Sequence, residues 1–449
     1  MSQTIKLKKG FDINLAGKAE KKIAELPQPE TFAIKPSDFL GMSRAKLLVK
    51  EGETVKAGTP IMIDKAVEDV FYCSPVSGEI AEIVRGAKRK ILEVRILADK
   101  EITYESFGQQ DVSSVTRETA IDLMKKSGVW PNIIQRPYGI VADPNSTPKS
   151  IFISAFDTHP LAADPSFAIQ GDEKYFEAGV EVLTKLTDGK VHINVNSQSA
   201  DFFKSSKAQI NTIDGPHPAG NVGVQIHHID PVNKGEVVWT VAPFGVAQIG
   251  KLFLEGKYDA SKVIALAGSE VKAPQYYRVL TGASISKLVD GTIKEGYVRF
   301  VSGNVLTGTQ INSTGYLGFY HNQITVIPEG ENSELFGWIL PTTKKLSFHR
   351  AFGLLSFLNG KKKEYVLDTN MKGQHRAFVQ TGAFERVVPM DVLPTHLIKA
   401  ILAEDFDDME GLGIYEVIEE DLALCEFIDV SKNDIQSILR EGLELVRNS

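Results

Sequence analysis

The chain has 449 residues, of which 43% are hydrophobic, and its 57 acidic residues outnumber 50 Lys and Arg, giving a formal net charge of −7. This length is more than one hydrophobic core normally holds, so roughly three or four domains are expected. The mild acidity argues against nucleic acid as a partner. Two cysteines, Cys73 and Cys425, exclude a disulfide framework and a four-thiolate cluster, and free thiols favour the cytoplasmic side.

The N-terminus, MSQTIKLKKG, lacks the hydrophobic core of a secretory signal, so export by that route is not expected. Residues 300–328 contain no Asp, Glu, Lys or Arg, but their glycines and side-chain amides make the segment too polar to span a bilayer. The sequence therefore predicts no transmembrane helix. Any membrane contact would be made through partner proteins or a surface patch.

A compact all-β module is predicted over residues 1–104. Residues 49–60, VKEGETVKAGTP, place two glycines between short alternating apolar runs, and SPVSGEIAEIV repeats this pattern around Gly78. The segment resembles the barrel-sandwich fold of biotinyl and lipoyl carrier domains, and Lys65 lies in a DKA tripeptide like that of their modified lysine. Thirteen positions separate Lys65 from Gly78, longer than the symmetric hairpin of such carriers, so we interpret Lys65 as a surface lysine.

A Rossmann-like α/β domain is predicted over residues 105–268. A helix is expected over 113–126, with Thr116 as its N-cap and Gly128 just past its end. Beyond it, buried-strand runs alternate with helical stripes, and this alternation is typical of a parallel sheet. The expected strands are 151–156, 191–195 and 263–266, and the expected helices are 175–186 and 246–255.

Two further domains complete the predicted fold, which is multidomain α/β and β. Residues 273–328 carry short apolar runs separated by glycines and rich in Val, Ile, Thr and Tyr, which indicate a small β-rich domain, assigned to 269–340. Helical stripes over residues 395–449 indicate a C-terminal helical domain, assigned to 341–449.

The most informative segment is GPHPAGNVGVQIHHIDPV, residues 215–232. Its glycines permit positive φ and its prolines lock φ, so we expect a rigid loop rather than a helix or a strand. The histidines are either hydrogen-bonding groups of this loop or, less favoured, zinc ligands; no cysteine or HxxxH spacing accompanies them, so no metal site is predicted. The residues assigned to this structural loop are Gly215, His217, Pro218, Gly220, His227 and Asp230.

This segment resembles the GPHPAG motif of the A-subunit family of sodium-translocating NADH:quinone oxidoreductases, which are bacterial respiratory complexes. The resemblance runs nearly end to end and includes IKLKKGFDINLAG, VSGEIAEIVRGAKRKI, RPYG, FDTHPLAADP, VWTVAPFGVAQIGKLF and LPTHLIKAILAEDFDDMEGLGIYEVIEEDLALCEF. It implies a peripheral protein on the cytoplasmic face of the inner membrane, inactive alone, in a six-subunit enzyme that oxidises NADH, reduces quinone and moves sodium outward. Its partners would be quinone and the other five subunits, B to F, which would provide membrane contact and carry the flavins, the iron–sulfur centre and the sodium path. Residues 269–340 would be a β-grasp ligand-binding domain.

Related proteins carry cofactors that this chain is not expected to hold. The NADH-binding flavoprotein of complex I and the C protein of the Rnf electron-transport complex hold flavin phosphate against a glycine-rich loop. The corresponding stretch here, GVWPNIIQRPYG, keeps only Gly128 and Gly139. Those relatives also bind clusters through CxxCxxCxxxCP runs, whereas Cys425 is the one thiol near the equivalent segments. We therefore expect no cofactor bound in this chain.

The pattern of an acidic stretch near the C-terminus does not predict a metal site. Residues 405–416 fall short of a calcium loop, because Glu410 stands where that motif needs glycine. Residues 400–431 contain acids and no Lys or Arg, which indicates a solvated acidic face or, as the alternative, a surface for a basic partner subunit.

With no nucleophile constellation, no catalytic residue is assigned and a binding role remains. A quinone site needs an apolar or aromatic slot and one or two hydrogen-bond donors. We expect quinone in the vacated flavin cleft, where His159 would donate or relay a proton. The expected lining residues are Trp130, Arg136, Tyr138, Asp157 and His159, with Phe39, Leu40 and Met42 of DFLGM as a second candidate, in a segment that this family is thought to expose to quinone. The competing interpretation of each residue is packing between domains.

Two other functions stay open from the sequence. The chain could be a non-redox assembly scaffold that retains an ancestral electron-carrier fold, with the GPHPAG loop facing a partner protein. It could also be a flavin- or NADH-binding electron-transfer subunit, in which case flavin absorbance would survive desalting.

Overall fold

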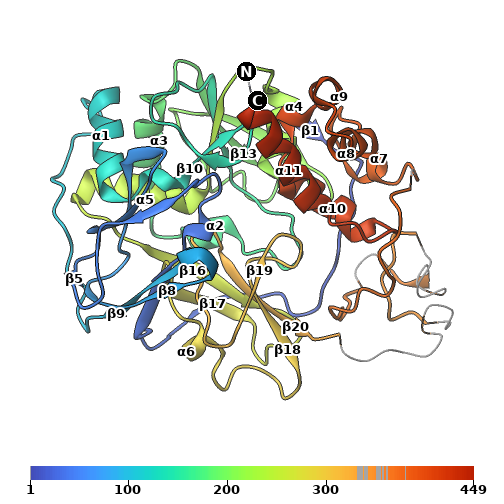
Figure 1. The fold of residues 1–449 in the computed structure, drawn as a ribbon, viewed down its shortest axis with the longest axis horizontal. Coiled ribbons are helices and arrows are strands. Elements are labelled where there is room, and N and C mark those ends of the chain that lie inside the picture. Colours follow the sequence, from blue (N-terminus) through green and yellow to red (C-terminus); the bar gives the residue numbers. More distant parts are fainter. Residues whose placement is uncertain are drawn as a thin grey trace.

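The structure is a computed structural model that describes residues 2–330, 337, 342–349, 355, 358–360, 363–379 and 381–449. Figure 1 shows a sheet with flanking helices in the upper part, two further groups of strands in the lower part, and the C-terminal helices at the upper right. The predicted boundary between residues 340 and 341 lies outside the described residues.

A seven-stranded sheet forms the centre of the upper part. Its first five strands are parallel, and the last two are antiparallel to their neighbours. The order is β1 (Thr4–Lys6), β14 (Gln209–Asp214), β13 (Lys190–Val195), β12 (Ser150–Ser154), β15 (Val238–Val241), β10 (Ile133–Arg136) and β11 (Ile140–Val141). The chain runs outward from β12 through β13 to β14 and then returns to pair β15 on the other side of β12. This reversal makes a switch point, where a crevice opens at the carboxyl ends of the strands.

Helices cover the faces of this sheet (Figure 1). Helices α3 (Glu173–Thr184) and α4 (Val222–Ile229) contact its strands, and α5 (Pro243–Glu255) packs on α3. The helices α1 (Arg117–Ser127) and α2 (Pro165–Ala168) contact α5, and the 3₁₀ turn η3 (Trp130–Asn132) precedes β10. The predicted caps of α1 are confirmed: the Thr116 side chain accepts a hydrogen bond from the Thr119 amide, and Gly128 adopts φ 82°. The predicted helix over 246–255 is confirmed as part of α5.

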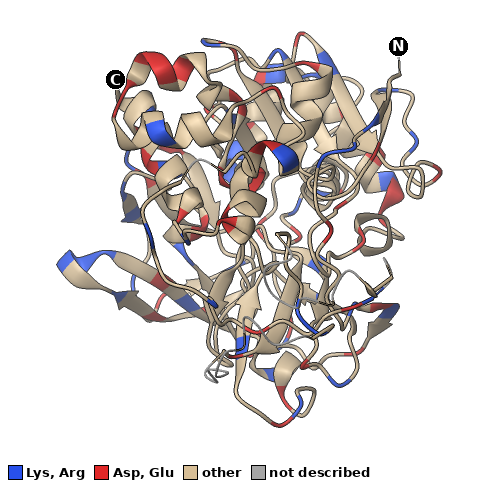
Figure 2. Ribbon diagram, turned by 90° about the vertical axis from the view of Figure 1, so that its right-hand side faces the viewer, with Lys and Arg blue, Asp and Glu red and all other residues tan. Residues whose placement is uncertain are grey.

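The barrel-sandwich module consists of two antiparallel sheets that share one core. One sheet has the order β3 (Thr31–Ile34), β9 (Ile91–Ala98), β8 (Gly78–Arg85) and β5 (Thr54–Val55), and the other β4 (Ala45–Leu47), β6 (Pro60–Asp64) and β7 (Val67–Cys73). The module also carries the 3₁₀ turns η1 (Pro36–Asp38) and η2 (Ala87–Arg89). Lys65 is exposed in the turn between β6 and β7, as expected of a surface lysine. The β8–β9 hairpin extends from the body with a basic tip, at the left in Figure 2.

A six-stranded sheet lies below the parallel one. Its order is β19 (Thr309–Ile311), β18 (Val298–Ser302), β20 (Gln323–Pro328), β16 (Ser261–Ala267), β17 (Gln275–Leu280) and β2 (Glu20–Ala24), with α6 (Ser286–Val289) beside it. The expectation that residues 263–266 join the parallel sheet is wrong, because β16 pairs with β17 and β20. A continuous apolar run fits a central strand of either sheet, so its pattern cannot choose between them.

The first residues of the chain do not join the barrel module in which they were predicted. Strand β1 pairs with β14 at the edge of the seven-stranded sheet, and β2 pairs with β17 at the edge of the six-stranded sheet. Strand partners are set by the tertiary arrangement, and three- to five-residue strands carry no signal that names a partner so distant in sequence.

The C-terminal region is helical, as predicted. It contains α7 (Phe384–Val387), α8 (Pro394–Leu402), α9 (Phe406–Gly411), η5 (Ile414–Glu416), α10 (Glu419–Ile428) and α11 (Ile435–Asn448). The predicted stripe on α11 is confirmed, since Ile435, Leu439, Leu443 and Val446 are buried. Among the described residues, no helix has the length and apolar character to cross a bilayer.

Candidate functional site

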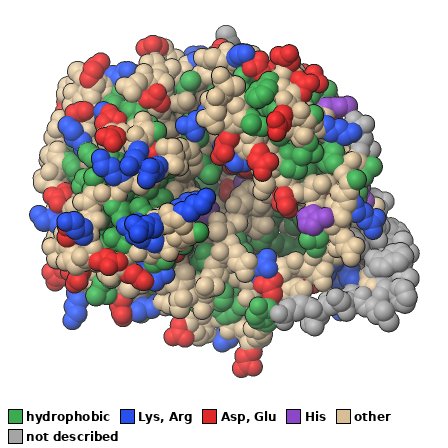
Figure 3. All heavy atoms as spheres, in the orientation of Figure 1, with side chains coloured by type: hydrophobic (Ala, Val, Ile, Leu, Met, Phe, Trp, Pro, Cys, Tyr) green, Lys and Arg blue, Asp and Glu red, His purple; other side chains and the backbone are tan. Residues whose placement is uncertain are grey.

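A cavity of about 370 Å³ lies at the switch point of the parallel sheet. Ser154 and Phe156, at the end of β12 and just beyond it, form part of its wall, and Ala242 and Pro243, which follow β15, form another part. The face shown in Figure 3 is hollowed near its middle. The carboxyl ends of strands at such a point are where α/β proteins bind ligands.

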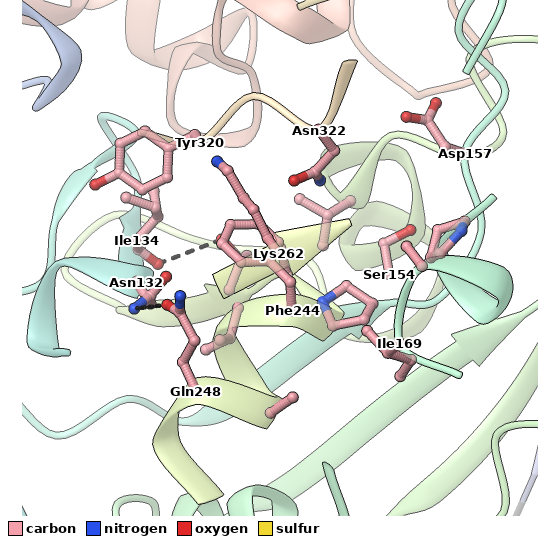
Figure 4. Close-up of a pocket in the computed structure, with 18 of the residues that line it drawn as sticks. Asn132, Ile134, Ser154, Asp157, Ile169, Phe244, Gln248, Lys262, Tyr320 and Asn322 are labelled. Atoms are coloured by element: carbon pink, nitrogen blue, oxygen red, sulfur yellow. Dashed lines mark hydrogen bonds between the residues drawn. The ribbon is translucent and has the colours of Figure 1, made fainter. Parts of the chain in front are cut away.

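Every part of the fold contributes to this wall. Leu40 comes from the barrel-sandwich module, Lys262 and Tyr320 from the six-stranded sheet and its loops, and Ile418 and Glu420 from the start of α10. Apolar and aromatic groups alternate with polar ones around the space, as the sticks in Figure 4 show. The cavity therefore exists only when all of these parts are assembled.

One side of the cavity carries an acid–base pair from the FDTHP segment. The Asp157 Oδ1 atom lies 2.7 Å from His159 Nδ1, and the buried Nε2 atom of His159 has no protein partner. Burial alone would lower the pKa of His159, but the charge of Asp157 and its hydrogen bond outweigh burial and raise it. For Asp157, burial opposes ionisation, yet the His159 charge holds its pKa below the ordinary value. The pair thus favours a protonated imidazole beside a carboxylate.

Arg136 sits next to this pair and joins two domains. Its side chain is 1% exposed, with Nη1 2.7 Å from Asp421 Oδ2 and Nη2 2.5 Å from Glu420 Oε1. Burial raises the pKa of Glu420, although Arg136 opposes that effect. The guanidinium is therefore occupied mainly by carboxylates of α10, and it anchors that helix to β10.

The opposite side of the cavity carries a buried lysine. Lys262 Nζ donates to the carbonyl oxygens of Phe319 and His321, each at 2.8 Å, and lies 5.3 Å from the centre of the Phe244 ring. Burial lowers the pKa of Lys262 to about 7, with Asp38 opposing this effect. Figure 4 shows the side chain extending between Tyr320 and Asn322.

Family comparisons agree with this architecture. The NqrA N-terminal barrel-sandwich hybrid domain matches residues 5–99, the NqrA second alpha/beta domain matches 115–258, and the NQRA C-terminal domain matches 263–313. The A-subunit of the Na(+)-translocating NADH-quinone reductase of Yersinia pestis bv. Antiqua (strain Angola) is 40% identical over 443 residues, which cover 98% of each chain. The proteins of that name from Serratia proteamaculans (strain 568) and Alcanivorax borkumensis are 40% and 38% identical, over 98% of this chain and 98% and 99% of theirs.

The chain belongs to the A-subunit family of Na⁺-translocating NADH-quinone reductases. This confirms the family predicted from the GPHPAG segment, and it makes the chain part of an oxidoreductase that translocates sodium. An NAD⁺-reducing [NiFe]-hydrogenase in the air-oxidized state aligns over 78% of this chain and 67% of its own, with 9% identity and a TM-score of 0.37, a likeness too slight to assign a fold.

Half of the quinone-site residues predicted for this family member do line the cavity. Leu40, Arg136, Asp157 and His159 are brought together there. The structure therefore confirms that these four residues lie around one cavity.

The other four do not line the cavity. Trp130 and Tyr138 were expected in this cleft and lie elsewhere, whereas Phe39 and Met42 belonged to the second candidate, at the edge of the barrel-sandwich module.

Trp130 is fully buried, and the centroid of its ring lies 5.5 Å from that of Trp239. Its Nε1 donates a hydrogen bond to the Ala142 carbonyl at 2.8 Å. Tyr138 is not part of the cavity wall, and the centroid of its ring lies 6.5 Å from that of the Tyr415 ring.

DFLGM is split in the same way. The Phe39 ring lines a separate small pocket, with its centroid 4.4 Å from that of the Tyr72 ring. Met42 packs against the hydrophobic core of the barrel-sandwich module. Aromatic and apolar side chains fill whichever core lies nearest, so their type alone did not reveal which of them face a cavity.

The GPHPAG segment is a loop only at its start, which corrects the prediction of a loop throughout. Residues Val222–Ile229 form α4, because Pro216, Pro218 and Pro231 all lie outside this stretch. Gly223 on α4 is needed for close packing: a Cβ there would lie 2.4 Å from Asp421 Oδ2 and 2.5 Å from Arg136 Nη1.

The loop proper is turned inward, against its own chain. The His217 amide donates to Asp12 Oδ1 at 2.8 Å, and its Nδ1 lies 3.1 Å from Thr158 Oγ1. The Gly220 amide donates to the same Thr158 hydroxyl at 2.9 Å, and Gly215 packs against Leu7. Pro218 is buried and preceded by a cis peptide bond. His217 and Pro218 are therefore held by contacts within the chain, whereas Gly215 at the start of the loop is exposed.

The later residues of the segment tie the C-terminal helices and β12 to α4. His227 Nδ1 lies 2.6 Å from Glu416 Oε2, and His228 Nε2 lies 2.8 Å from the Pro389 carbonyl. The Ser150 hydroxyl at the start of β12 donates to Asp230 Oδ2 at 2.8 Å, and Asp230 Oδ1 lies 3.0 Å from Lys149 Nζ. Within the part of the chain that the structure describes, no group of three or more His, Cys, Asp or Glu is placed to hold a metal ion.

Sequence reasoning missed several cavity residues. Asn132 and Gln248 stand inside two of the quoted motifs, GVWPNIIQRPYG and VWTVAPFGVAQIGKLF, and Lys262 begins the apolar run of β16. A polar residue inside a stretch that is otherwise buried is the signal that would have identified them. Other lining residues that the sequence did not single out include Phe244, Tyr320, Asn322 and Glu420.

Proposed function

We propose that this protein is the peripheral, cofactor-free member of a six-subunit sodium pump and that its central cavity binds quinone. It would sit on the cytoplasmic face of the bacterial inner membrane, contribute to assembly, and reach the membrane through the other five subunits, B to F. The single observation that carries the quinone proposal is the cavity at the switch point. It combines apolar and aromatic walls with polar groups that have no protein partner.

The geometry does not fit a flavin bound in the manner of the related flavoproteins. The stretch GVWPNIIQRPYG forms η3 and β10, with Trp130, Pro131 and Asn132 buried in the core. The backbone amide of Asn132 is already bonded to the Val129 carbonyl at 3.1 Å. Cys425 is fully buried in α10, and burial raises the pKa of its thiol. We propose that flavins, iron–sulfur and NADH belong to the partner subunits.

The domain types belong to the same proposal. The parallel strands with a switch point support a Rossmann-like domain, and the mixed six-stranded sheet supports a β-grasp module. The boundary between them, predicted at 268, would fall before β16, which starts at Ser261. We propose the same bounds as predicted for the barrel-sandwich module, without strands β1 and β2, and for the C-terminal domain, whose helices α7 to α11 begin at Phe384.

The chain's own residues would position the quinone and supply a proton. Reduction to the hydroquinone takes two electrons, which partner subunits would deliver, and two protons, of which His159 would supply one and water the other. The free Nε2 atom of His159 would donate to a ring oxygen, and Asp157 keeps that imidazole protonated. Lys262, at the opposite side, would favour negative charge on the ring.

A photoreactive quinone analogue tests this placement in the full chain and in the assembled complex. We expect labelled peptides to include the segments around His159, Gln248 and Lys262. An Ala247→Phe substitution fills the cavity from α5 and is expected to abolish this labelling. Leu254→Phe on the exposed side of the same helix is the control and is expected to leave it unchanged.

Labelling confined to partner subunits, or insensitive to Ala247→Phe, would contradict the proposal. Two rival functions have their own signatures in the same material. Flavin absorbance that survives desalting of the purified chain would support an electron-transfer role. Complex assembly without any quinone labelling of this protein would support a scaffold.

A further inference from the structure

Two side-chain amides in the cavity wall form a chain that starts at a backbone carbonyl. Asn132 Nδ2 donates to the Val129 carbonyl at 3.0 Å and to Gln248 Oε1 at 3.1 Å. A backbone carbonyl can only accept, so Val129 fixes which end of the Asn132 amide is nitrogen. Because that nitrogen faces Gln248, the Gln248 amide must present its oxygen to Asn132. The orientation of both amides therefore follows from the backbone.

The outcome is an N–H donor with no protein partner. Gln248 is 3% exposed and lines the cavity, yet its Nε2 atom makes no hydrogen bond. Figure 4 shows the two amides joined by a dashed line, with Phe244 and Lys262 nearby. Buried donors are nearly always satisfied in folded proteins, and leaving one unpaired costs free energy.

The packing around this pair indicates a built site. Gly245, one turn before Gln248 on α5, makes room for Asn132: a Cβ at that position would lie 3.0 Å from both Asn132 Cβ and Oδ1. Asn132 is itself 4% exposed. An apolar side chain at position 248 would remove the unpaired Nε2 donor, but it would also remove the acceptor of the Asn132 amide. The two effects on stability oppose each other, so stability by itself does not favour glutamine there.

We propose that Gln248 Nε2 donates a hydrogen bond to a carbonyl oxygen of the ring bound in the cavity, and that Asn132 is the positioning residue that aims it. This inference rests on the proposed function and adds to it the atom that recognises the quinone carbonyl. The Phe244 ring and the side chain of Ile134, both in the cavity wall, supply the apolar surface beside that donor. The ligand class is a planar ring that carries a carbonyl acceptor.

Two probes of the same shape isolate this hydrogen bond in the purified full chain. Menadione carries two ring carbonyls, and 2-methylnaphthalene has the same fused ring and methyl group without them. Gln248→Met keeps the volume of the side chain and removes the donor. We expect it to weaken menadione binding about ten-fold or more and to leave 2-methylnaphthalene binding unchanged, as measured by tryptophan fluorescence or calorimetry.

Stability gives an independent readout. Gln248→Met removes the unpaired Nε2 donor but also the acceptor of the Asn132 amide, so a ligand-binding role predicts that the Tm of the ligand-free chain changes little. The matched control is Gln225→Met on α4. Gln225 is also fully buried, but its Nε2 donates to Ser154 Oγ at 2.8 Å and its Oε1 accepts from Asn194 at 3.0 Å, so its loss is expected to lower the Tm. Gln248→Leu serves as a second variant.

The binding and stability measurements test the inference and the proposed function separately. If the wild-type chain binds menadione and both Gln248 variants bind it equally well, the inference is overturned while the proposed function stands. Equal affinity of the wild type for the two probes also overturns it, because no carbonyl is then recognised. If both variants lower the Tm as much as Gln225→Met, the amide is structural and the inference is again overturned. If the wild type binds neither probe, the proposed function fails with it.

Discussion

Arg136 lies at the cavity, as predicted, but its neighbours determine what its guanidinium binds. It reaches the cavity wall, as the RPYG motif suggested, but both terminal nitrogens are bonded to carboxylates of α10. Arg440 also holds an acidic residue at the start of that helix, the Glu419 carboxylate, at a more exposed position. The two arginines therefore differ mainly in burial.

Arg136→Met is expected to destabilise the fold by about 3–5 kcal/mol, because it leaves the carboxylates of Asp421 and Glu420 buried without a countercharge. Arg440→Met, whose side chain is 17% exposed, should cost only about 1 kcal/mol. Urea unfolding of both variants measures the difference. Equal losses would show that the Arg136 pair is as well solvated as the surface one.

His217 makes the fold sensitive to acid. Burial, together with the charge of His159, lowers the pKa of His217 to about 3, whereas its ordinary value is 6.5. As pH falls below about 6.5 the unfolded chain takes up a proton that the folded chain refuses until about pH 3. Stability therefore falls with decreasing pH in this window, by up to about 1.4 kcal/mol per pH unit from this one group.

His217→Asn removes this titration and keeps a polar group near Thr158. We expect the variant to lose less stability than the wild type between pH 6.5 and about pH 4, in urea unfolding at a series of pH values. An unchanged slope would mean that the folded chain already carries a proton on His217.

At the scale of elements, the contact between α3 and α5 fixes the helix that carries Gln248. Two glycines let the helices touch backbone to backbone: a Cβ on Gly250 would lie 1.8 Å from the Tyr175 carbonyl oxygen, and one on Gly179 would lie 2.0 Å from that of Val246. No side chain fits at either place without moving a helix. The glycines are therefore required by packing, despite their cost to helix propensity.

Gly250→Ala is expected to destabilise the chain by about 1–3 kcal/mol or more through overpacking. Gly411→Ala, at the end of α9 with nothing within 4 Å of its Cβ position, should be neutral or stabilise by up to about 1 kcal/mol. Thermal unfolding compares the two. If both substitutions had the same effect, the close approach of α3 and α5 would not be rigid.

Element prediction succeeded where local chemistry decides and failed where pairing does. Thr116 and Gly128 gave the ends of α1, and the stripe of α11 gave its buried face. Residues 222–229 became a helix inside a segment judged a loop from its glycines, because no proline falls within them. Residues 263–266 were correctly predicted as a strand, but β16 pairs with β17 and β20 rather than with the parallel sheet.

At the scale of the molecule, the N-terminal segment links parts that are far apart in sequence. Strand β1 completes one sheet and β2 another before the chain enters the barrel-sandwich module at β3. The segment between them also holds the GPHPAG loop, since the Phe11 amide donates to the His217 carbonyl at 2.8 Å. Removing the segment should therefore disturb regions that it precedes by about 200 residues or more.

A chain that starts at residue 25 is expected to keep the barrel-sandwich module and to lose protection elsewhere. Its β14 and β17 strands would become unpaired edges, which favour association with other chains. Hydrogen exchange should show faster exchange in β14 and β17 but not in β6 or β7. Removal of residues 447–449 at the other end is the control and should change neither. Unchanged exchange rates in β14 and β17 would mean that pairing with β1 and β2 contributes little to the stability of these two strands.

The sequence alone determined the family, the barrel-sandwich and α/β classes of the first two domains and the ends of α1, because these depend on local residue types and on motif order. Tertiary structure decided which strands pair, which predicted site residues share one cavity, and which polar atoms remain without a partner. These properties depend on contacts between residues far apart in sequence, such as Arg136 with Asp421 and Asn132 with Gln248. A residue's type gives the bonds that it can make, and only its neighbours in space determine which of those bonds are left for a ligand.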